Sequence, residues 1–569
     1  MAERLNDNDI RIIIMAEKIR TVSVAHGDIK NKASCFEEYA EEFALRHIAA
    51  YMDKYEKPIG YEGMREYGKC LRRDLKSALT KDVEAWKNRK LPRGAIIAVI
   101  RSTYSFLNIS TNPEDPMGSV VGAVYDYDYM RYLPLHRTKE IFKAVQGLTL
   151  SEMKASETKD LYTTAVDISE VVPLRSNPNE IPCENYIWDE EEKIKIPYCE
   201  DVVLMSHGKV DYNPNAQNPH IHNDYDGSDW DVDSWLLEIC CGDQEMVDLI
   251  WQIAARIVRP YRQWLGLVLF SGTGNNGKGT LLELFRNLVG AGAYSKASMS
   301  SFGDRFGLDD LFGSQVVLCD ENKMEFKFSG ADRLKAATDR HSVFSIEEKN
   351  RQEKIYMSYS GLIIECVNEL PRMADKTNAW YRKIIPIPFD QSYSGKERVY
   401  IKDDYLNRPE VLEYVKRRAI ETEIVPITER YLPKRSYELL QYYKIINDPI
   451  RAFWNEMKDE LAWDAVPSLM LHDLYVAWFK RSSPNGKATG RNTFLDSLEK
   501  IINEEPSGWE TRFGRNQIVY KPNSLPEEPL LIEYDLTRWM NQTYVGMNRS
   551  QRLASPNVPD RFRGIVRTK

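Results

Sequence analysis

The sequence predicts a multidomain α/β protein built around a parallel sheet. Three apolar runs of strand length lie between residues 264 and 367, and the first of them passes through a glycine-rich turn into an amphipathic helix. A chain of 569 residues is also too long for a single hydrophobic core. We therefore expect an α/β core with a helical N-terminal region before it and a smaller domain of helices and strands after it.

Bulk composition narrows the class of protein. No window approaches the roughly 18 to 20 consecutive apolar residues of a membrane span, and the first residues lack the apolar stretch of a signal peptide. We expect a cytoplasmic protein with no membrane partner. The eight cysteines show no zinc-ligand spacing, which predicts reduced thiols. The formal net charge of −8 does not exclude nucleic-acid binding, because such binding depends more on local clusters of positive charge than on the net charge.

The N-terminal part, residues 1–137, is predicted to be a mostly helical domain of unknown role. Near its end, Asp126 and Asp128 could share one face of a strand and bind Mg²⁺. An isolated Asp-x-Asp is common at strand ends, so we favour a structural role for this pair.

Residues 138–239 are polar and predict an accessory domain of short strands and loops that becomes helical from Ser234. One loop in it gathers two imidazoles and two carboxylates. These side chains are His220, His222, Asp224 and Asp226. They could bind a metal, but an exposed polar loop is favoured because nothing in the pattern orders the ligands.

The glycine-rich turn carries the main functional prediction. Residues 264–270 predict a buried strand, and an apolar helical pattern begins at Lys278 and stops near Gly290. In such a turn, backbone N–H groups converge on phosphates, and the lysine reaches the β and γ phosphates. We therefore predict an ATP site. Its phosphate-binding residues are expected to be Gly272, Thr273, Gly274, Asn275, Asn276, Gly277, Lys278, Gly279 and Thr280.

Two acids and one hydroxyl are the candidates for the metal and the hydrolytic water. A Ser or Thr usually follows the lysine to hold Mg²⁺, but this chain has Gly279 there, so Thr280 is expected to contact either a phosphate or a metal-bound water. The second apolar run, residues 316–319, ends in Asp320 and Glu321. We expect Asp320 to hold Mg²⁺ and Glu321 to activate the attacking water, because both follow a strand beside the phosphate turn.

Polar residues after the third apolar run, and basic residues before a later apolar run at 384–389, complete the predicted catalytic set. Asn368 follows the apolar residues 362–367 and is expected to sense the γ phosphate and the attacking water. Arg382 and Lys383 precede the closing apolar run, and either could enter a neighbouring subunit's site as a finger that stabilises transferred charge. A solvated basic pair is the alternative.

A charged hairpin between the second and third runs predicts contact with nucleic acid. Residues 343–346 and 355–357 have strand patterns, and a charged segment joins them. Lys349, Arg351 and Lys354 in that segment are suited to gripping a phosphate backbone.

The C-terminal portion begins with a helical connector, residues 396–447, followed by a small domain, residues 448–540. The expected elements are helices at 450–454, 471–479 and 493–502 and strands at 509–513 and 517–520. This order is typical of a winged helix, which binds DNA or a protein partner. The candidate phosphate contacts are Arg491, Arg512, Arg515 and Lys521. Residues 541–569 hold six basic residues against one acid and predict a flexible tail with nonspecific DNA contacts.

In this order the motifs resemble those of the superfamily 3 helicases, a modified AAA+ group, and within it the primase-helicases of poxviruses, phages and plasmids. The corresponding segments are 272–280 for Walker A, 320–321 for Walker B, 335–354 for the DNA hairpin, Asn368 for the sensor and Arg382 for the finger. The AAA+ core would occupy residues 240–395. Gly279 and the Arg382-Lys383 pair depart from the usual family pattern.

The resemblance implies a hexameric ring that moves along DNA with 3′ to 5′ polarity in the replication of a phage, plasmid or genomic island. It also implies ATP and Mg²⁺ as ligands, and single-stranded DNA, origin duplex and replication proteins as partners. Family members often carry an N-terminal primase domain, but Asp126 and Asp128 alone do not lead us to predict priming.

Two other functions stay open at this point. An origin-binding initiator would use the same ATPase to melt duplex DNA that the winged helix recognises. A nucleotide kinase is suggested by the Gly-Lys-Gly-Thr form of residues 277–280, although Asp320-Glu321 and the accessory domains argue against it.

Overall fold

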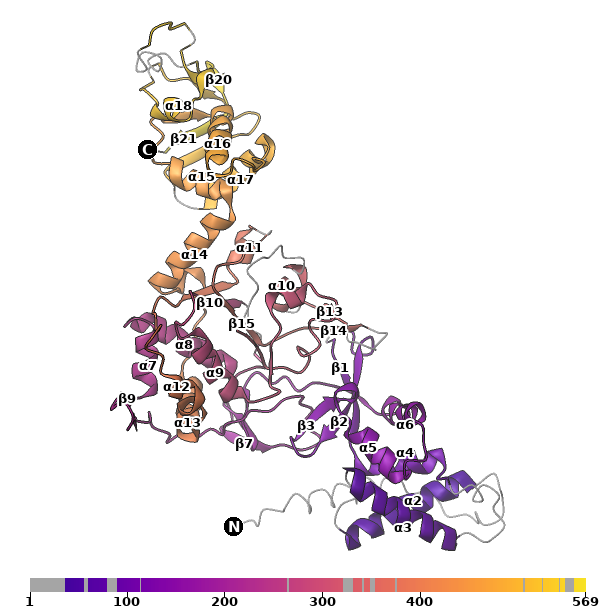
Figure 1. Cartoon of the computed structure of the whole chain (residues 1–569). Helices are drawn as coiled ribbons and strands as arrows, with labels where there is room; N and C mark the ends of the chain where they lie inside the picture. The colour runs from indigo at the N-terminus through magenta and orange to yellow at the C-terminus, as the bar shows by residue number, and fades with distance from the viewer. Residues whose placement is uncertain are drawn as a thin grey trace. The chain divides into compact units, whose positions relative to one another are not determined.

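The computed structural model describes most of the chain (Figure 1). The described residues are 36–55, 60–78, 90–112, 114–262, 266–320, 331–339, 342–347, 354–373, 376–504, 507–523, 525–541, 543–547 and 557–568. They form two compact units. The first contains residues up to Glu369 together with Ile387–Pro433, and the second contains Leu370–Pro386 together with residues from Lys434 onwards. Among the described helices, none is long and apolar enough to cross a membrane.

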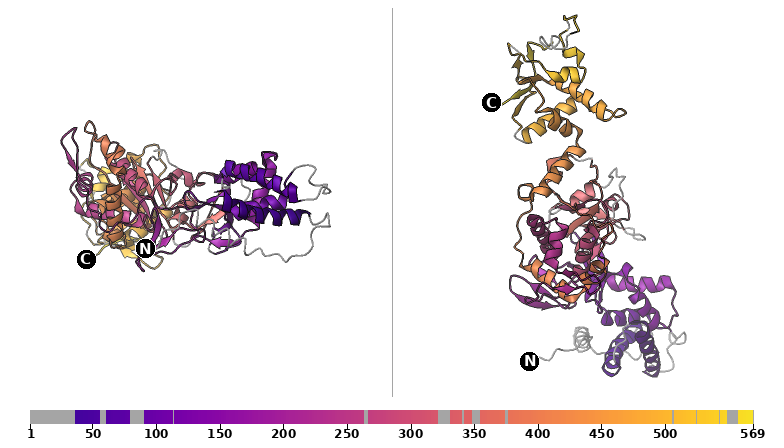
Figure 2. Two further views of the ribbon diagram at one scale, coloured as in Figure 1. Left: turned by 90° about the horizontal axis from the view of Figure 1, so that it is seen from below. Right: turned by 60° about the vertical axis from the view of Figure 1, so that its left-hand side comes forward.

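The first unit begins with a group of helices that pack on one another (Figure 2). They are α2 (Phe36–Lys54), α3 (Gly60–Ala78), α4 (Arg93–Thr103), α5 (Glu140–Leu148) and α6 (Ala155–Asp167). Apolar residues at helical spacing make their common core; for example, Tyr67, Leu71 and Leu75 of α3 are fully buried. The prediction of short strands and loops was therefore wrong for residues 140–167, whose apolar stripes complete this helical core.

A four-stranded sheet follows the helices, so the predicted mostly helical region also contains strands. Its strands are β1 (Phe106–Ser110), β2 (Val120–Asp126), β3 (Arg131–Pro134) and β4 (Val171–Pro173), in the order β3-β2-β1-β4. The pairs β1–β2 and β2–β3 are antiparallel, and β1–β4 is parallel. After the sheet come the short strands β5 (Glu180–Pro182), β6 (Tyr186–Asp189), β7 (Ile194–Pro197), β8 (Ile221–His222) and β9 (Asp229–Trp230).

The predicted parallel sheet forms the centre of the first unit. Its strands are β10 (Leu267–Ser271), β11 (Tyr294–Ser295), β12 (Val316–Cys319), β15 (Leu362–Val367) and β16 (Ile384–Pro388), in the order β11-β12-β15-β10-β16. The pairs β10–β15, β12–β15 and β11–β12 are parallel. All residues of β12 and β15 are buried, as expected for strands covered on both faces.

Helices pack around this sheet. They are α7 (Val232–Ile239), α8 (Gln244–Ile257), α9 (Lys278–Val289), α12 (Val399–Asp403) and α13 (Pro409–Glu421). The side chains of Asp231 and Asp243 cap α7 and α8 by accepting bonds from backbone N–H groups of the first turn. We expected α12 and α13 in a connector, but α13 packs against α8 and α9 (Figure 1).

The charged hairpin is present as two antiparallel strands. After α10 (Ala331–Ala337), β13 (Phe344–Ile346) pairs with β14 (Ile355–Met357). Ile346 and Ile355 are fully buried and fix the register. The described residues also contain short 3₁₀ turns, which are η4 (Leu135–Arg137), η5 (Met299–Phe302), η6 (Tyr405–Asn407), η7 (Glu429–Tyr431) and η8 (Thr537–Trp539).

The second unit joins one internal segment to the C-terminal part of the chain. Its helices are α11 (Asn378–Tyr381), α14 (Lys434–Asn447), α15 (Pro449–Met457), α16 (Ser468–Ser482), α17 (Arg491–Glu504) and α18 (Pro529–Glu533). The Tyr443 hydroxyl of α14 donates to the carbonyl of Pro371 at 2.7 Å, and Asn447 Nδ2 donates to the Tyr381 hydroxyl at 3.0 Å. These bonds attach the internal segment to α14.

The strands of the second unit pair over long distances in the sequence. They are β17 (Ala465–Pro467), β18 (Trp509–Arg512), β19 (Val519–Tyr520), β20 (Arg561–Phe562) and β21 (Gly564–Arg567). We predicted two strands at 509–513 and 517–520, which residues 514–516 join. In the structure β18 pairs with β21, and β19 pairs with β20, both antiparallel.

The end of the chain is therefore part of the fold. In the three-stranded sheet β17-β21-β18, the last strand occupies the middle position. Ile565 of β21 is fully buried in the core with Phe453, Leu474 and Phe494. The prediction of a flexible tail was wrong for residues 561–567, because burial of this side chain and two ladders of backbone hydrogen bonds hold them.

Candidate functional site

The glycine-rich turn lies where the sheet presents the carboxyl ends of its parallel strands. Residues 272–277 connect β10 to α9. β15 lies beside β10, and β12 lies beside β15, so Asp320 and Asn368 follow strands at the same edge of the sheet. Ligands of open α/β sheets bind at this edge. Asn368 is exposed there.

Lys278 turns its side chain into the loop. Its ammonium group donates to the carbonyl oxygen of Gly272, to that of Thr273 at 3.1 Å and to Asn276 Oδ1 at 3.1 Å. The residue is 7% exposed. Burial lowers the pKa of the ammonium, and the negative potentials of Cys366 and Asp320 oppose that shift. The loop thus holds a largely desolvated cation whose present partners are neutral oxygens, which a phosphate would replace.

The backbone of the loop requires glycine at two positions. Gly277 has φ of +92°, in the left-handed region, and precedes the first helical residue. A Cβ at Gly272 would lie 2.3 Å from Asn276 Nδ2 and 2.4 Å from the Phe389 carbonyl oxygen. Asn276 Nδ2 donates to that same carbonyl at 3.1 Å, so the residue after β16 closes the back of the loop.

We expect Gly272→Ala to deform the glycine-rich loop. The added methyl group overpacks the site, at a cost of about 1–3 kcal/mol, and should weaken nucleotide binding by about tenfold or more. Gly490→Ala, outside the loop, is the control, since a Cβ at Gly490 meets no atom within 4 Å. Titration of both variants with a fluorescent ATP analogue would check this; equal affinities would contradict the loop geometry.

Asp320 faces the start of α9. A Cβ at Gly279 would lie 3.3 Å and 3.4 Å from the two carboxylate oxygens of Asp320. The structure therefore brings Lys278, Gly279 and Asp320 together. A carboxylate at the N-terminus of a helix, next to a phosphate-binding loop, suits a hydrated Mg²⁺ ion. Thr280 is half-buried in the first turn of α9.

Other predicted catalytic residues are not assembled in the same way. Glu321 lies outside the described residues. Arg382 and Lys383 follow α11 in the second unit. Arg382 is exposed, and its Nε donates to the Asn378 carbonyl oxygen at 3.4 Å.

The hairpin base carries a cation that the sequence did not reveal. Lys349 and Arg351 lie outside the described residues, but Lys354 Nζ lies 3.2 Å from Glu347 Oε1. Arg305, from the loop after η5, donates from Nε to Glu347 Oε2 at 2.6 Å. Arg305 and Lys354 lower the pKa of Glu347, so one acid is shared by two cations. Only the tertiary fold brings Arg305 to the hairpin, since 42 residues separate it from Glu347.

The predicted phosphate contacts of the second unit differ in their surroundings. Arg491 is exposed at the start of α17. Arg512 Nη2 lies 3.0 Å from Glu510 Oε2, so this guanidinium already has an acidic partner. Arg515 is exposed in the turn after β18.

The two candidate metal clusters have structural explanations. Asp126 Oδ1 accepts from the backbone N–H groups of Asp128 at 3.0 Å and Tyr129 at 3.2 Å, so it stabilises the turn between β2 and β3. His222 Nδ1 lies 2.8 Å from Asp229 Oδ1 on an exposed strand. Among the residues described, no group of three or more His, Cys, Asp or Glu side chains could hold a metal.

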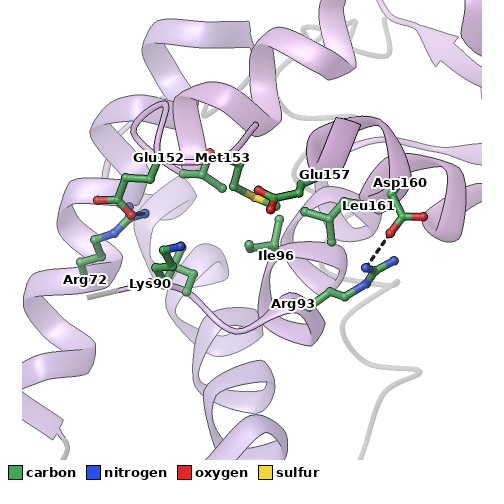
Figure 3. A pocket seen from close by; sticks show the side chains of 11 residues that line it. Arg72, Lys90, Arg93, Ile96, Glu152, Met153, Glu157, Asp160 and Leu161 are labelled. Atoms are coloured by element: carbon green, nitrogen blue, oxygen red, sulfur yellow. Dashed lines mark ion pairs between the residues drawn. The ribbon is translucent and has the colours of Figure 1, made fainter. Parts of the chain in front are cut away.

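A pocket of about 320 Å³ lies among the N-terminal helices (Figure 3). Arg93 Nη1 pairs with Asp160 Oδ2 at 2.6 Å, and Arg72 Nη2 lies 3.7 Å from Glu152 Oε2. Because these cations and acids neutralise one another, the pocket offers less free charge to a ligand than the glycine-rich loop does.

Two family models match parts of the sequence. Residues 270–383, which include the glycine-rich loop, match a family of unknown function, DUF5906. Residues 446–525 match a family described as poxvirus D5 protein-like. The second match supports a superfamily 3 helicase-like kind of protein, of the primase-helicase type that acts in replication. No curated protein matches the sequence.

Solved structures give weaker likenesses. An A form apo structure of the NrS-1 C-terminal region has 13% identity and a TM-score of 0.39, covering 73% of this chain and 87% of that one. Another apo structure of that region, residues 305–718, has 14% identity and a TM-score of 0.39, with coverages of 76% and 97%. JCV helicase with a bound small molecule has 16% identity and a TM-score of 0.22, with coverages of 37% and 65%. TM-scores below 0.5 are too low to carry a structural or functional argument.

Proposed function

We propose that this protein is an ATP-dependent replicative DNA helicase of a phage, plasmid or genomic island. The observation that supports this most is the meeting of a buried lysine and a carboxylate at a glycine-rich loop: Lys278 and Asp320 converge on the first turn of α9. That pairing suits a nucleoside triphosphate with its metal ion. The poxvirus D5 protein-like match favours DNA replication over nucleotide phosphorylation as the setting.

Each residue of the site has a proposed role. The backbone N–H groups of residues 272–280 and the Lys278 ammonium bind the phosphates. Asp320 holds hydrated Mg²⁺, with Thr280 contacting a phosphate or a metal-bound water. Bound Mg²⁺ would neutralise the negative charge that develops between the β and γ phosphates. Glu321 accepts the proton of the attacking water, and Asn368 orients that water without adding charge.

The proposed ring assembly rests on a basic residue that a neighbouring subunit would supply to the ATP site. Arg382 is exposed and carries the positive charge needed to stabilise the transferred phosphoryl group. We propose that Arg382 or Lys383 enters the site of a neighbouring copy and that the copies close into a ring such as a hexamer. Lys349, Arg351 and Lys354 of the hairpin would then grip single-stranded DNA and move it as the sites hydrolyse ATP with 3′ to 5′ polarity.

We further propose that the second unit contains a winged helix. The order α15, β17, α16, α17, β18 and β21, with β21 between β17 and β18 in the sheet, supports this. Arg491 at the start of α17 is then available to a DNA phosphate. An origin-binding initiator is therefore the second candidate function, and it would show sequence-specific duplex binding without ATP.

The test of the helicase proposal is ATP hydrolysis with and without single-stranded DNA. We expect DNA to stimulate the wild type several-fold, and Lys349→Ala to lose most of that stimulation because it removes a backbone contact. Lys159→Ala, which alters an exposed lysine of α6, should retain the full stimulation. If DNA leaves the wild-type rate unchanged, the translocase proposal fails, and a search for specific duplex binding becomes the next experiment.

A further inference from the structure

The second unit carries a protruding surface where the β18–β21 pair is followed by the β19–β20 pair. Arg512 pairs with Gly564, and pairing resumes only where Val519 meets Phe562. Residues 513–518 on one side therefore face a single residue, Arg563, on the other. Extra residues of this kind bulge out from a strand pair. We call residues 513–521 and 560–563 the wing surface.

The bulge is an ordered turn and not a loose loop. The backbone N–H of Gly514 donates to Gln517 Oε1 at 2.8 Å, and the N–H of Gln517 donates back to the Gly514 carbonyl at 3.1 Å. Phe513 and Phe562 pack against the hydrophobic core of the unit and anchor both sides of the bulge. Arg515 is exposed within this turn.

The outer face of the β19–β20 ribbon combines an aromatic ring with a cation. Tyr520 and Arg561 are directly opposite each other, and the guanidinium carbon lies 5.4 Å from the centre of the tyrosine ring. Tyr520 is 64% exposed, and Ile518, which precedes the strand, is 49% exposed. An isolated aromatic residue on a surface needs no explanation, but this one is paired with an arginine beside further unpaired cations.

Positive charge on the wing surface lacks acidic partners. Several arginines elsewhere in this unit have acidic partners: Arg451 pairs with Glu504 at 2.8 Å, Arg481 with Glu533 at 3.5 Å, Arg512 with Glu510 at 3.0 Å and Arg567 with Asp464 at 3.0 Å. Within the described part of the chain, no carboxylate forms an ion pair with Arg515, Lys521, Arg561 or Arg563. Asp560 is the one acid on the wing surface.

We propose that the wing surface binds duplex DNA. Arg515, Lys521, Arg561 and Arg563 contact phosphates, and the Tyr520 ring with Ile518 lies against the sugars and base edges of one groove. A two-stranded ribbon fits a groove of duplex DNA, and cations fixed on a ribbon and a closed turn match the regular phosphate spacing of a duplex better than a flexible single strand. The inference rests on the proposed function in DNA replication and adds a duplex-binding surface that lies outside the hairpin and the ATP site.

The experiment measures binding of the full-length protein to a fluorescent duplex of mixed sequence over a series of salt concentrations. Arg515→Ala/Arg563→Ala should weaken binding by about tenfold or more and reduce the slope of log K against log salt by about 2, since two phosphate contacts are lost. Arg481→Ala is the matched control, because this arginine lies in the same unit but is paired with Glu533. Its affinity should stay within about twofold of the wild type.

Tyr520→Ala should weaken duplex binding without changing the salt slope, and Tyr520→Phe should restore most of the affinity because the ring remains. The proposal is overturned if the double variant keeps the wild-type slope, if Arg481→Ala weakens binding equally, or if the double variant loses affinity for single strands only. ATP hydrolysis stimulated by single-stranded DNA is measured in parallel. Wild-type protein without such stimulation, but with a wing-dependent duplex affinity, would refute the helicase and not the wing surface.

Discussion

Lys278→Ala is expected to lower ATP hydrolysis by about a thousandfold, the scale at which loss of one positioned charge donor slows an enzyme. The residue is 7% exposed, and its ammonium group donates hydrogen bonds to three oxygens of the loop. Its loss removes the side chain proposed to neutralise the β and γ phosphates. The measurement is phosphate release under saturating ATP and Mg²⁺.

Two further variants separate binding from hydrolysis. Glu321→Gln removes the proposed base but no phosphate contact, so it should still bind ATP while hydrolysis is abolished. Asp320→Asn should lower the affinity for Mg²⁺, visible as a rise in the metal concentration needed for half-maximal rate. Because Lys278 also satisfies loop carbonyls, thermal melting is recorded for every variant. Retained turnover in a folded Lys278→Ala protein would refute the site assignment.

Deleting residues 560–569 is expected to unfold the second unit. The deletion removes β21 from the middle of the sheet β17-β21-β18, which leaves two strands without their shared partner. Losing the buried Ile565 side chain alone costs about 2–5 kcal/mol, a large fraction of the stability of a small domain. Limited proteolysis should cleave the truncated protein within residues 448–540 under conditions that leave the full chain intact.

Arg561→Ala is the control for this prediction. It lies in the deleted segment, but its side chain is exposed, so it should change the free energy of unfolding by less than about 0.5 kcal/mol. Ile565→Ala should give a partial loss of thermal stability. A truncated protein that resists protease as well as the full chain would show that the terminal strand does not hold the unit together.

Much of the first unit could be predicted from the sequence because its signals are local. Continuous apolar runs at Leu267, Val316 and Leu362 give strands that are buried on both faces, and a parallel sheet is the common way to bury them. Once the strands are parallel, Asp320 and Asn368 must emerge at the edge that carries the glycine-rich loop. The hairpin was predictable for the same reason, since its two short strands flank one charged segment.

Other features depend on partners that are distant in the chain. The helices α5 and α6 lie in a largely polar stretch of sequence, and packing against α3 and α4 makes them part of the N-terminal core. Likewise, Val519 and Tyr520 follow the strand at 509–512 after a short turn, but they pair with residues about forty positions later. No local pattern distinguishes these alternatives, because strand pairing depends on which buried side chains meet.

The sequence by itself determined the glycine-rich turn between β10 and α9, because glycine, lysine and the flanking strand and helix patterns act within a few residues of one another. Only the tertiary structure decided the surroundings of the charged side chains. Glu347 has two cationic partners, and the Phe389 carbonyl accepts a hydrogen bond from Asn276 behind the loop. Residues 564–567 of the basic chain end form the central strand of a sheet. The physical reason is that the charge and hydrogen bonding of a side chain depend on its neighbours in space, and the fold chooses these neighbours by burying apolar surface.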